Sequence, residues 1–174
     1  MSFTPFPIDD VSQATLVIDS HHHEIHEGDA FFYADSVTLA SAATQDYLIT
    51  TPNTAEWAHM VVEMDGTAVT TFQFYESATR TGTTLQTLWN NNRNSANTAG
   101  ITIHKGATGG ADGNLMKTYS SGTASGNSKM PSTLGFGSEV ILKQNTKYLV
   151  RITSGTAGNL CNINFNWYEH TSGE

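Results

Sequence analysis

The sequence predicts an all-β fold, namely an antiparallel β-sandwich of the jelly-roll kind with one long loop rich in glycine, serine and asparagine. Short runs of β-branched and aromatic residues recur along the 174-residue chain, separated by Gly, Asp, Ser and Pro. They follow one another at intervals of about 8 to 15 residues, which is typical of a two-sheet fold. No long segment carries the i, i+3, i+4, i+7 apolar stripe of an amphipathic helix.

The expected strands follow in chain order. The N-terminal third supplies runs at 15–18, 31–33, 37–39 and 47–50. Residues 57–64 and 69–75 flank Asp65-Gly66, a dipeptide that favours a tight hairpin turn. Later runs occupy 85–89, 101–104, 140–142, 148–152 and 163–167. In the last run Ile163, Phe165 and Trp167 alternate with asparagines, as in a strand with one buried face.

The stretch 106–137 contains few large apolar residues and is expected to be the long loop, since loops of such length are commonly functional. No linker or internal repeat divides the chain. The predicted organisation is therefore an N-terminal arm, residues 1–14, followed by a single β-sandwich domain, residues 15–174.

Charge and hydropathy exclude several classes of partner. Eight basic against sixteen acidic residues give a net charge of −8, and there is no run of Lys or Arg to neutralise phosphates, so direct binding of nucleic acid is not expected. No apolar run approaches the ~20 residues of a membrane span, and the N-terminus lacks the basic region of a secretory signal.

The one cysteine and the three tryptophans of the chain are expected in the core. Cys161 lies in an apolar run and is interpreted as a small buried hydrophobe, because free cysteine is among the most buried residue types. The three tryptophans, Trp57, Trp89 and Trp167, fall inside expected strands, so core packing is favoured over a platform for stacking sugars.

A histidine-rich run at 20–28 invites two metal-binding interpretations. A zincin helix needs H-E-x-x-H, and here Glu24 stands one place too late. The spacing of His21, His23 and Glu27 matches the H-x-H-x3-E ligand motif of cupins, which are jelly-roll proteins. However, Thr15 and Ala34 occupy the places of the glycines that frame that motif, and a second motif is absent.

The remaining histidines, His59, His104 and His170, lie in no matching context. The sequence therefore assigns no metal ligand and no cofactor. The imidazoles are interpreted as hydrogen-bonding groups in a turn or an interface. If the segment is extended, His22, Glu24 and His26 share one face, and such a row beside carboxylates would make a contact acid-sensitive.

No catalytic constellation is recognisable. There is no G-x-S-x-G motif, and nothing in the spacing of Asp9-Asp10 or of Glu24 and Glu27 fixes the separation that a glycosidase needs. The asparagine-rich run 90–94 around Arg93 fits two interpretations equally, a solvated turn capped by its own side chains or a docking element. The chain is predicted not to be an enzyme.

Six segments together resemble small structural proteins encoded in tailed-bacteriophage genomes. They are the histidine-rich run 20–28, the segments 51–54 and 57–59, the asparagine-rich run 90–95, the stretch 141–154 and the ending 167–171. The resemblance spans about residues 15 to 171, except for the variable glycine-rich loop. The triple His21-His22-His23 departs from the two-histidine form typical of that family.

The resemblance implies a virion structural protein, closest to the decoration or cement proteins on the outside of the phage head. It implies the capsid surface of the virion as location, synthesis in the host cytoplasm, the major capsid protein as partner, and homo-oligomerisation, with a trimer favoured. The expected interface residues are Phe3 and Phe6 of the apolar arm together with His22, Glu24, His26, Asn91 and Arg93.

Two other functions stay open. The first is a glycan-binding module of a phage head or tail fibre, for which exposed Trp or Tyr side chains would be the discriminating feature. The second is a cupin-like metalloprotein, for which stoichiometric metal in the purified protein would be decisive.

Overall fold

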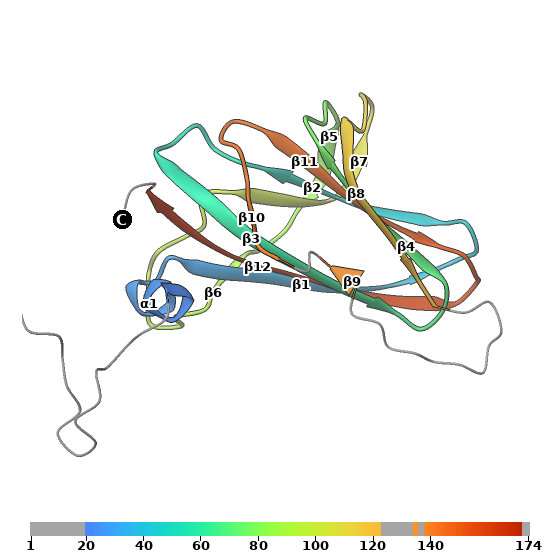
Figure 1. The fold of residues 1–174 in the computed structure, drawn as a ribbon, viewed down its shortest axis with the longest axis horizontal. Helices are drawn as coiled ribbons and strands as arrows, with labels where there is room; N and C mark the ends of the chain where they lie inside the picture. The colour runs from blue at the N-terminus through green and yellow to red at the C-terminus, as the bar shows by residue number, and fades with distance from the viewer. Residues whose placement is uncertain (1–19, 123–133, 136–137, 172–174) are drawn as a thin grey trace, which may run out of the picture.

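The computed structural model describes residues 20–122, 134–135 and 138–171. In this part of the chain two antiparallel sheets pack face to face, with one short helix, α1 (Ser20–Glu27), at one end (Figure 1). The predicted all-β sandwich is confirmed. The arm 1–14, with Phe3 and Phe6, and the strand expected at 15–18 lie outside the described residues.

Each sheet contains six of the described strands, and all pairs are antiparallel. Sheet 1 has the spatial order β10 (Val140–Ile141), β3 (Glu56–Gly66), β12 (Asn159–Thr171), β1 (Ala30–Leu39) and β6 (Trp89–Asn90), with β9 (Leu134–Gly135) also paired to β3. Sheet 2 has the order β5 (Thr81–Leu85), β7 (Thr102–Thr108), β2 (Thr44–Thr50), β11 (Lys147–Ser154), β4 (Thr70–Glu76) and β8 (Asn114–Ser121).

The connections are those of a jelly roll. The chain changes sheet at every step from β1 to β4 and again from β11 to β12. In sheet 1, β12 lies between β1 and β3, and in sheet 2, β11 lies between β2 and β4. The last two strands of the chain are therefore inserted between strands of its N-terminal half. Most contacts consequently join residues that are distant in sequence.

The core lies between the two sheets and follows the predicted alternation. In β12, Cys161, Ile163, Phe165 and Trp167 are buried, whereas the asparagines between them face outward. Cys161 is fully enclosed, as expected, and burial raises the pKa of its thiol. Aromatic rings from both sheets meet in this layer, including Tyr47, whose ring centroid lies 5.7 Å from that of Phe165.

Two of the three tryptophans are not core residues. Trp167 is buried at 1% exposure, but Trp57 is 39% exposed and Trp89 is 46% exposed. The prediction was wrong for these two because strand membership does not fix which face a residue occupies. Trp57 belongs to the outward set of β3, and Trp89 pairs with the outward residue Phe32.

The hairpin predicted at Asp65-Gly66 does not exist. Both residues lie inside β3, where they pair with Asn162 and Cys161, and β4 belongs to the opposite sheet. The chain crosses between the sheets at 67–69. The buried side chain of Asn159 holds the backbone of this crossing in place through hydrogen bonds. Its Oδ1 accepts from the Ala68 amide at 2.9 Å, and its Nδ2 donates to the Val69 carbonyl at 3.1 Å.

The expected long loop is partly strand. Residues 102–108 form β7 and 114–121 form β8, which pairs with β4 across a register shift at Phe74/Tyr75. The polar composition misled the prediction because β8 is an edge strand whose side chains are largely exposed. The run predicted at 85–89 is also divided, since β5 and β6 belong to different sheets.

A charged bridge closes the open side of the sandwich between β1 and sheet 2. The Asp35 carboxylate accepts from Tyr47 Oη at 2.8 Å and lies 2.6 Å from Lys105 Nζ. Burial alone raises the pKa of Asp35, but the hydrogen bonds from Lys105 and Tyr47 outweigh burial, so this pKa lies below its usual value.

Because its pKa is lowered in the folded state, Asp35 stabilises the protein above its unfolded-state pKa, and this contribution is lost as the pH falls through the folded-state value. We expect Asp35→Asn to cost about 1 kcal/mol of unfolding free energy near pH 7 and progressively less below about pH 4. Urea unfolding across this range measures the difference. The pH trend should shrink in a Lys105→Met background; a trend that stays unchanged there would assign it to other groups.

Candidate functional site

The histidine-rich run forms a helix. α1 is eight residues long, so the shared face of His22, Glu24 and His26 that an extended segment would give does not apply. The helix ends at Gly28, whose φ of 88° is in the left-handed region. The Gly28 amide donates to the Ile25 carbonyl at 3.2 Å and the Asp29 amide to the Glu24 carbonyl at 2.9 Å. These two bonds form a Schellman motif, which explains why the helix stops at this glycine.

The apolar periodicity of the sequence does not indicate this helix, because Ile25 is its only apolar residue. Its other contacts join polar side chains four positions apart: His22 Nε2 lies 2.9 Å from His26 Nε2, and His23 Nε2 lies 3.4 Å from Glu27 Oε1. Such pairs lie on one helix face. The helix thus places His22 and His26 together, as an extended segment would have done, but separates them from Glu24.

The asparagine-rich run is a turn that caps its own backbone and also fastens α1. Oδ1 of Asn90 accepts from the Asn92 amide at 2.8 Å, as expected for a self-capped turn. The Nδ2 of Asn90 donates to the Gly28 carbonyl at 2.6 Å, and Nδ2 of Asn92 donates to the His26 carbonyl at 3.2 Å. Two elements far apart in the sequence are therefore tied together at the C-terminal end of α1.

Beside the helix, the outer face of sheet 1 carries a second group of histidines. His59 Nε2 lies 2.9 Å from His170 Nε2, and His59 Nδ1 lies 2.7 Å from Glu139 Oε1. Tyr168 stacks on His59 with ring centroids 4.7 Å apart and donates from Oη to the same Glu139 oxygen at 3.2 Å. Burial raises the pKa of Tyr168 to about 12, so it remains a donor at neutral pH.

α1 contributes His21 and Glu24 to this group. The His21 ring makes an edge contact with Tyr168 at 6.0 Å between centroids. Burial raises the pKa of the Glu24 carboxyl, while the charge of the His170 imidazole acts in the opposite direction. We call His21, Glu24, His59, Glu139, Tyr168 and His170 the histidine face. It lies at the end of sheet 1 where β12 finishes and α1 is attached (Figure 1).

The two exposed tryptophans belong to the same outer surface. Trp57 pairs across β3 and β12 with His170. Trp89 lies in β6, and the Arg93 guanidinium is 4.9 Å from its ring centroid, within the range of a cation–π contact. Both exposed tryptophans, one on β3 and one on β6, therefore lie on the outer surface of sheet 1.

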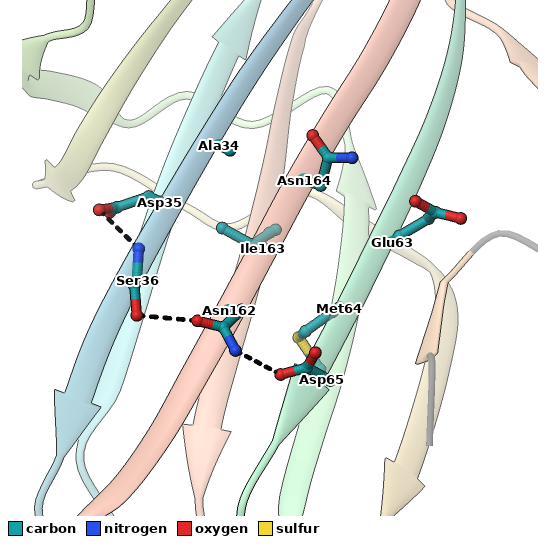
Figure 2. A pocket seen from close by; sticks show the side chains of 9 residues that line it. All are labelled: Ala34, Asp35, Ser36, Glu63, Met64, Asp65, Asn162, Ile163 and Asn164. Atoms are coloured by element: carbon teal, nitrogen blue, oxygen red, sulfur yellow. Dashed lines mark hydrogen bonds between the residues drawn. The ribbon is translucent and has the colours of Figure 1, made fainter. Parts of the chain in front are cut away.

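Farther along the same face is an open depression of about 640 Å³ across β1, β12 and β3 (Figure 2). A ladder of hydrogen bonds crosses its floor, from Ser36 Oγ to Asn162 Oδ1 at 2.8 Å and from Asn162 Nδ2 to Asp65 Oδ1 at 2.6 Å. Glu63 and Asn164 stand beside this ladder (Figure 2). The depression is lined by the amides and carboxylates of Asn162, Asn164, Glu63 and Asp65 together with the apolar residues Ala34, Met64 and Ile163.

Of the predicted interface residues, those that the structure describes lie on α1 or in the asparagine-rich turn that fastens it, whereas Phe3 and Phe6 lie outside the described residues. His22 and His26 are exposed on α1, and Glu24 is half-buried against the histidine face. Asn91 is half-buried in the turn, with its amide donating to the Ala30 carbonyl at 2.8 Å, and Arg93 is exposed over Trp89. Their role as an interface remains a prediction.

Sequence reasoning missed His59, Glu139, Tyr168 and His170 as members of one group. Strand alternation alone marks His59 and His170 as outward residues, but nothing in the sequence says that β3 pairs with β12. The cupin interpretation also fails at this point, because His21, His23 and Glu27 lie on a helix outside the sandwich rather than on a strand.

Comparisons of the chain with protein-family models, with curated proteins and with solved structures found no match. The resemblance to phage structural proteins therefore rests on the sequence motifs. Among the described residues, no helix has the length and apolar character needed to span a membrane.

The helix cap gives a local prediction. A β-carbon at Gly28 would collide with Oγ of Ser95 and would also impose a left-handed φ on a non-glycine residue. We expect Gly28→Ala to lower the unfolding free energy by about 2 kcal/mol and to speed amide exchange in α1. Gly158→Ala is the matched control, since Gly158 has φ 71° but open space around it; equal losses in both variants would show that the Ser95 contact contributes nothing.

Proposed function

We propose that this chain is a non-enzymatic structural protein of a bacteriophage particle, one that decorates the outside of the head and stabilises the capsid lattice. The observation that carries the proposal is where the shared motifs meet. The helix 20–27, the strand residues 57–59, the turn 90–95 and the ending 167–171 are dispersed in the sequence but contact one another at one end of sheet 1.

A cluster of this kind favours a contact surface over a catalytic centre. Its polar groups are largely engaged with one another, and the neighbouring depression is open rather than enclosed. A decoration protein acts by binding the assembled lattice better than the free subunits, so modest affinity at each of many copies stabilises the whole shell. The partner would be the major capsid protein, with the decoration protein bound as an oligomer, a trimer being favoured.

The test uses particles of a variant of the encoding phage that lacks the gene for this protein. Purified protein is added back, and co-sedimentation and the thermal stability of the heads are measured. We expect saturable binding and more stable heads. The double variant His26→Ala/Arg93→Ala should bind at least ten times more weakly, whereas Lys143→Ala, whose exposed side chain pairs with Glu76 of sheet 2, should bind normally. Absence of the chain from wild-type virions, by mass spectrometry, would refute the proposal.

A second candidate is favoured by the exposed tryptophans. Trp57 and Trp89 are exposed on the same sheet as the histidine face, and the depression on that sheet offers amides and carboxylates to sugar hydroxyls. A glycan-binding module would show array hits and a change of tryptophan fluorescence that Trp57→Ala or Trp89→Ala abolishes. An array without hits would eliminate this candidate and leave the decoration role untouched.

A further inference from the structure

The two imidazoles of His59 and His170 converge on one point. β3 and β12 pair so that Tyr168 lies opposite His59, and His170 is therefore the diagonal neighbour on the same outer face. The ring centroids are 4.5 Å apart, and the two Nε2 atoms are 2.9 Å apart. Both rings thus direct their distal nitrogen, the atom that most often ligates a metal, to the same place.

Glu139 fixes which nitrogen of His59 is available. Its carboxylate accepts a hydrogen bond from Nδ1 of His59 at 2.7 Å, so the neutral ring carries its proton there and presents the Nε2 lone pair toward His170. Tyr168 holds the same carboxylate through its hydroxyl and packs on the His59 ring. A carboxylate behind the Nδ1–H of a histidine is the arrangement that orients imidazole ligands at metal sites.

The separation of the nitrogens selects a class of ion. With metal–nitrogen bonds of about 2.0 Å, two nitrogens 2.9 Å apart subtend about 90° at the ion. This angle corresponds to adjacent positions of an octahedral or square-planar ion, as with Ni²⁺ or Cu²⁺, and is narrower than the tetrahedral angle of Zn²⁺.

The charges around His59 and His170 and the solvent exposure of the pair both favour the binding of a cation. Glu139 places a carboxylate beside His59, and Lys and Arg side chains are absent from the described contacts of this cluster. The His59 side chain is 12% exposed and that of Glu139 is 39% exposed, so water can complete the coordination.

We propose that His59 and His170 form a two-imidazole site for a divalent transition-metal ion that accepts ligands at 90°, with Glu139 as the residue that positions His59. The site does not depend on the capsid role, and it is distinct from the cupin-like motif, whose histidines lie on α1. In the metal-free protein Nε2 of His170 donates to Nε2 of His59; when the ion binds, that proton leaves Nε2, and the neutral His170 ring carries its proton on Nδ1.

The competing site is the exposed pair His22 and His26, whose Nε2 atoms are also 2.9 Å apart on α1. The test therefore starts from His22→Ala/His26→Ala, purified without a histidine tag. Calorimetric titration of this background with NiCl₂ at pH 7.5 is expected to give one ion per chain, together with a rise in the melting temperature. Adding His170→Ala should weaken binding at least tenfold, and adding Glu139→Gln should weaken it about tenfold.

Two controls keep the result interpretable. His23→Ala in the same background removes another exposed histidine and should leave Ni²⁺ binding unchanged. If His170→Ala fails to fold, the unsubstituted rings of the background protein still decide the question, because bound Ni²⁺ should broaden the NMR signals of His59 and His170 first. Absence of binding in the background, equal affinity after Glu139→Gln, or broadening confined to other histidines would each overturn the proposal.

Discussion

Arg151→Ala is expected to lower the free energy of unfolding by about 2 to 3 kcal/mol. The Arg151 guanidinium grips Asp46 through two bonds, Nε to Oδ1 at 2.7 Å and Nη2 to Oδ2 at 2.9 Å. It also donates to Asp112 from Nη1 at 2.7 Å, and Asp112 is shared with Arg80. One side chain of β11 thus joins β2 to the loop before β8, and its removal leaves two carboxylates poorly compensated.

The effect should be large because the network is shielded from solvent. Arg151 is 17% exposed and Asp46 is 11% exposed. The Arg151 bonds also hold the pKa of Asp112 below its usual value. Urea unfolding measures the loss, and Arg151→Lys should fall between wild type and alanine because lysine keeps the charge but not the fork.

The matched control for Arg151 is Lys143→Ala. Lys143 Nζ lies 2.7 Å from Glu76 Oε1, but its side chain is 69% exposed, so we expect a change of less than about 1 kcal/mol. Equal destabilisation by the two substitutions would mean that shielding does not govern the strength of these ion pairs.

Glu169→Ala is expected to cost about 3 kcal/mol of unfolding free energy, because it leaves three donors without an acceptor. Oε2 accepts from the Gly100 amide at 2.8 Å, and Oε1 accepts from the Ile101 amide at 3.2 Å and from Trp167 Nε1 at 2.8 Å. The carboxyl group is nearly buried, and it holds the segment before β7 against the end of sheet 1.

Glu169→Gln distinguishes the contribution of the lost hydrogen bonds to stability from that of the lost side-chain volume. The glutamine keeps one oxygen for Trp167 and Ile101 but opposes the Gly100 amide with a donor, so we expect about half the loss seen in alanine. Hydrogen exchange should accelerate at the Gly100 and Ile101 amides in both variants. Glu63→Ala, on an exposed position of β3, should change stability by less than about 0.5 kcal/mol; a similar loss there would remove the special role of Glu169.

Local pattern predicted the strands better than it predicted their partners. The alternation in 163–167 gave the buried set of β12 correctly because side-chain direction has a period of two within one strand. Asp65-Gly66 misled because the dipeptide describes only a local preference, and pairing with β12 kept both residues extended. Trp57 and Trp89 misled for a related reason, since a large apolar side chain on the outward face of a strand remains exposed.

The candidate site was predictable only in part. The histidine-rich run and the asparagine-rich turn stood out in the sequence, because each concentrates chemistry within a few residues. Their attachment to each other depends on Asn90 and Asn92 reaching the backbone of α1, and Glu139 reaches His59 only because β10 pairs with β3. Contacts of this kind are set by the order of strands in the sheet, which short-range pattern does not contain.

Composition and periodicity act within single elements, and they were sufficient to predict a β-sandwich, the buried residues of β12 and the two polar runs that concentrate chemistry. Only the tertiary structure decided the jelly-roll order, the outward position of two tryptophans and the convergence of His59, His170 and Glu139. Burial and side-chain convergence are properties of paired strands, and the pairs β3·β12 and β10·β3 join residues about 80 to 115 positions apart.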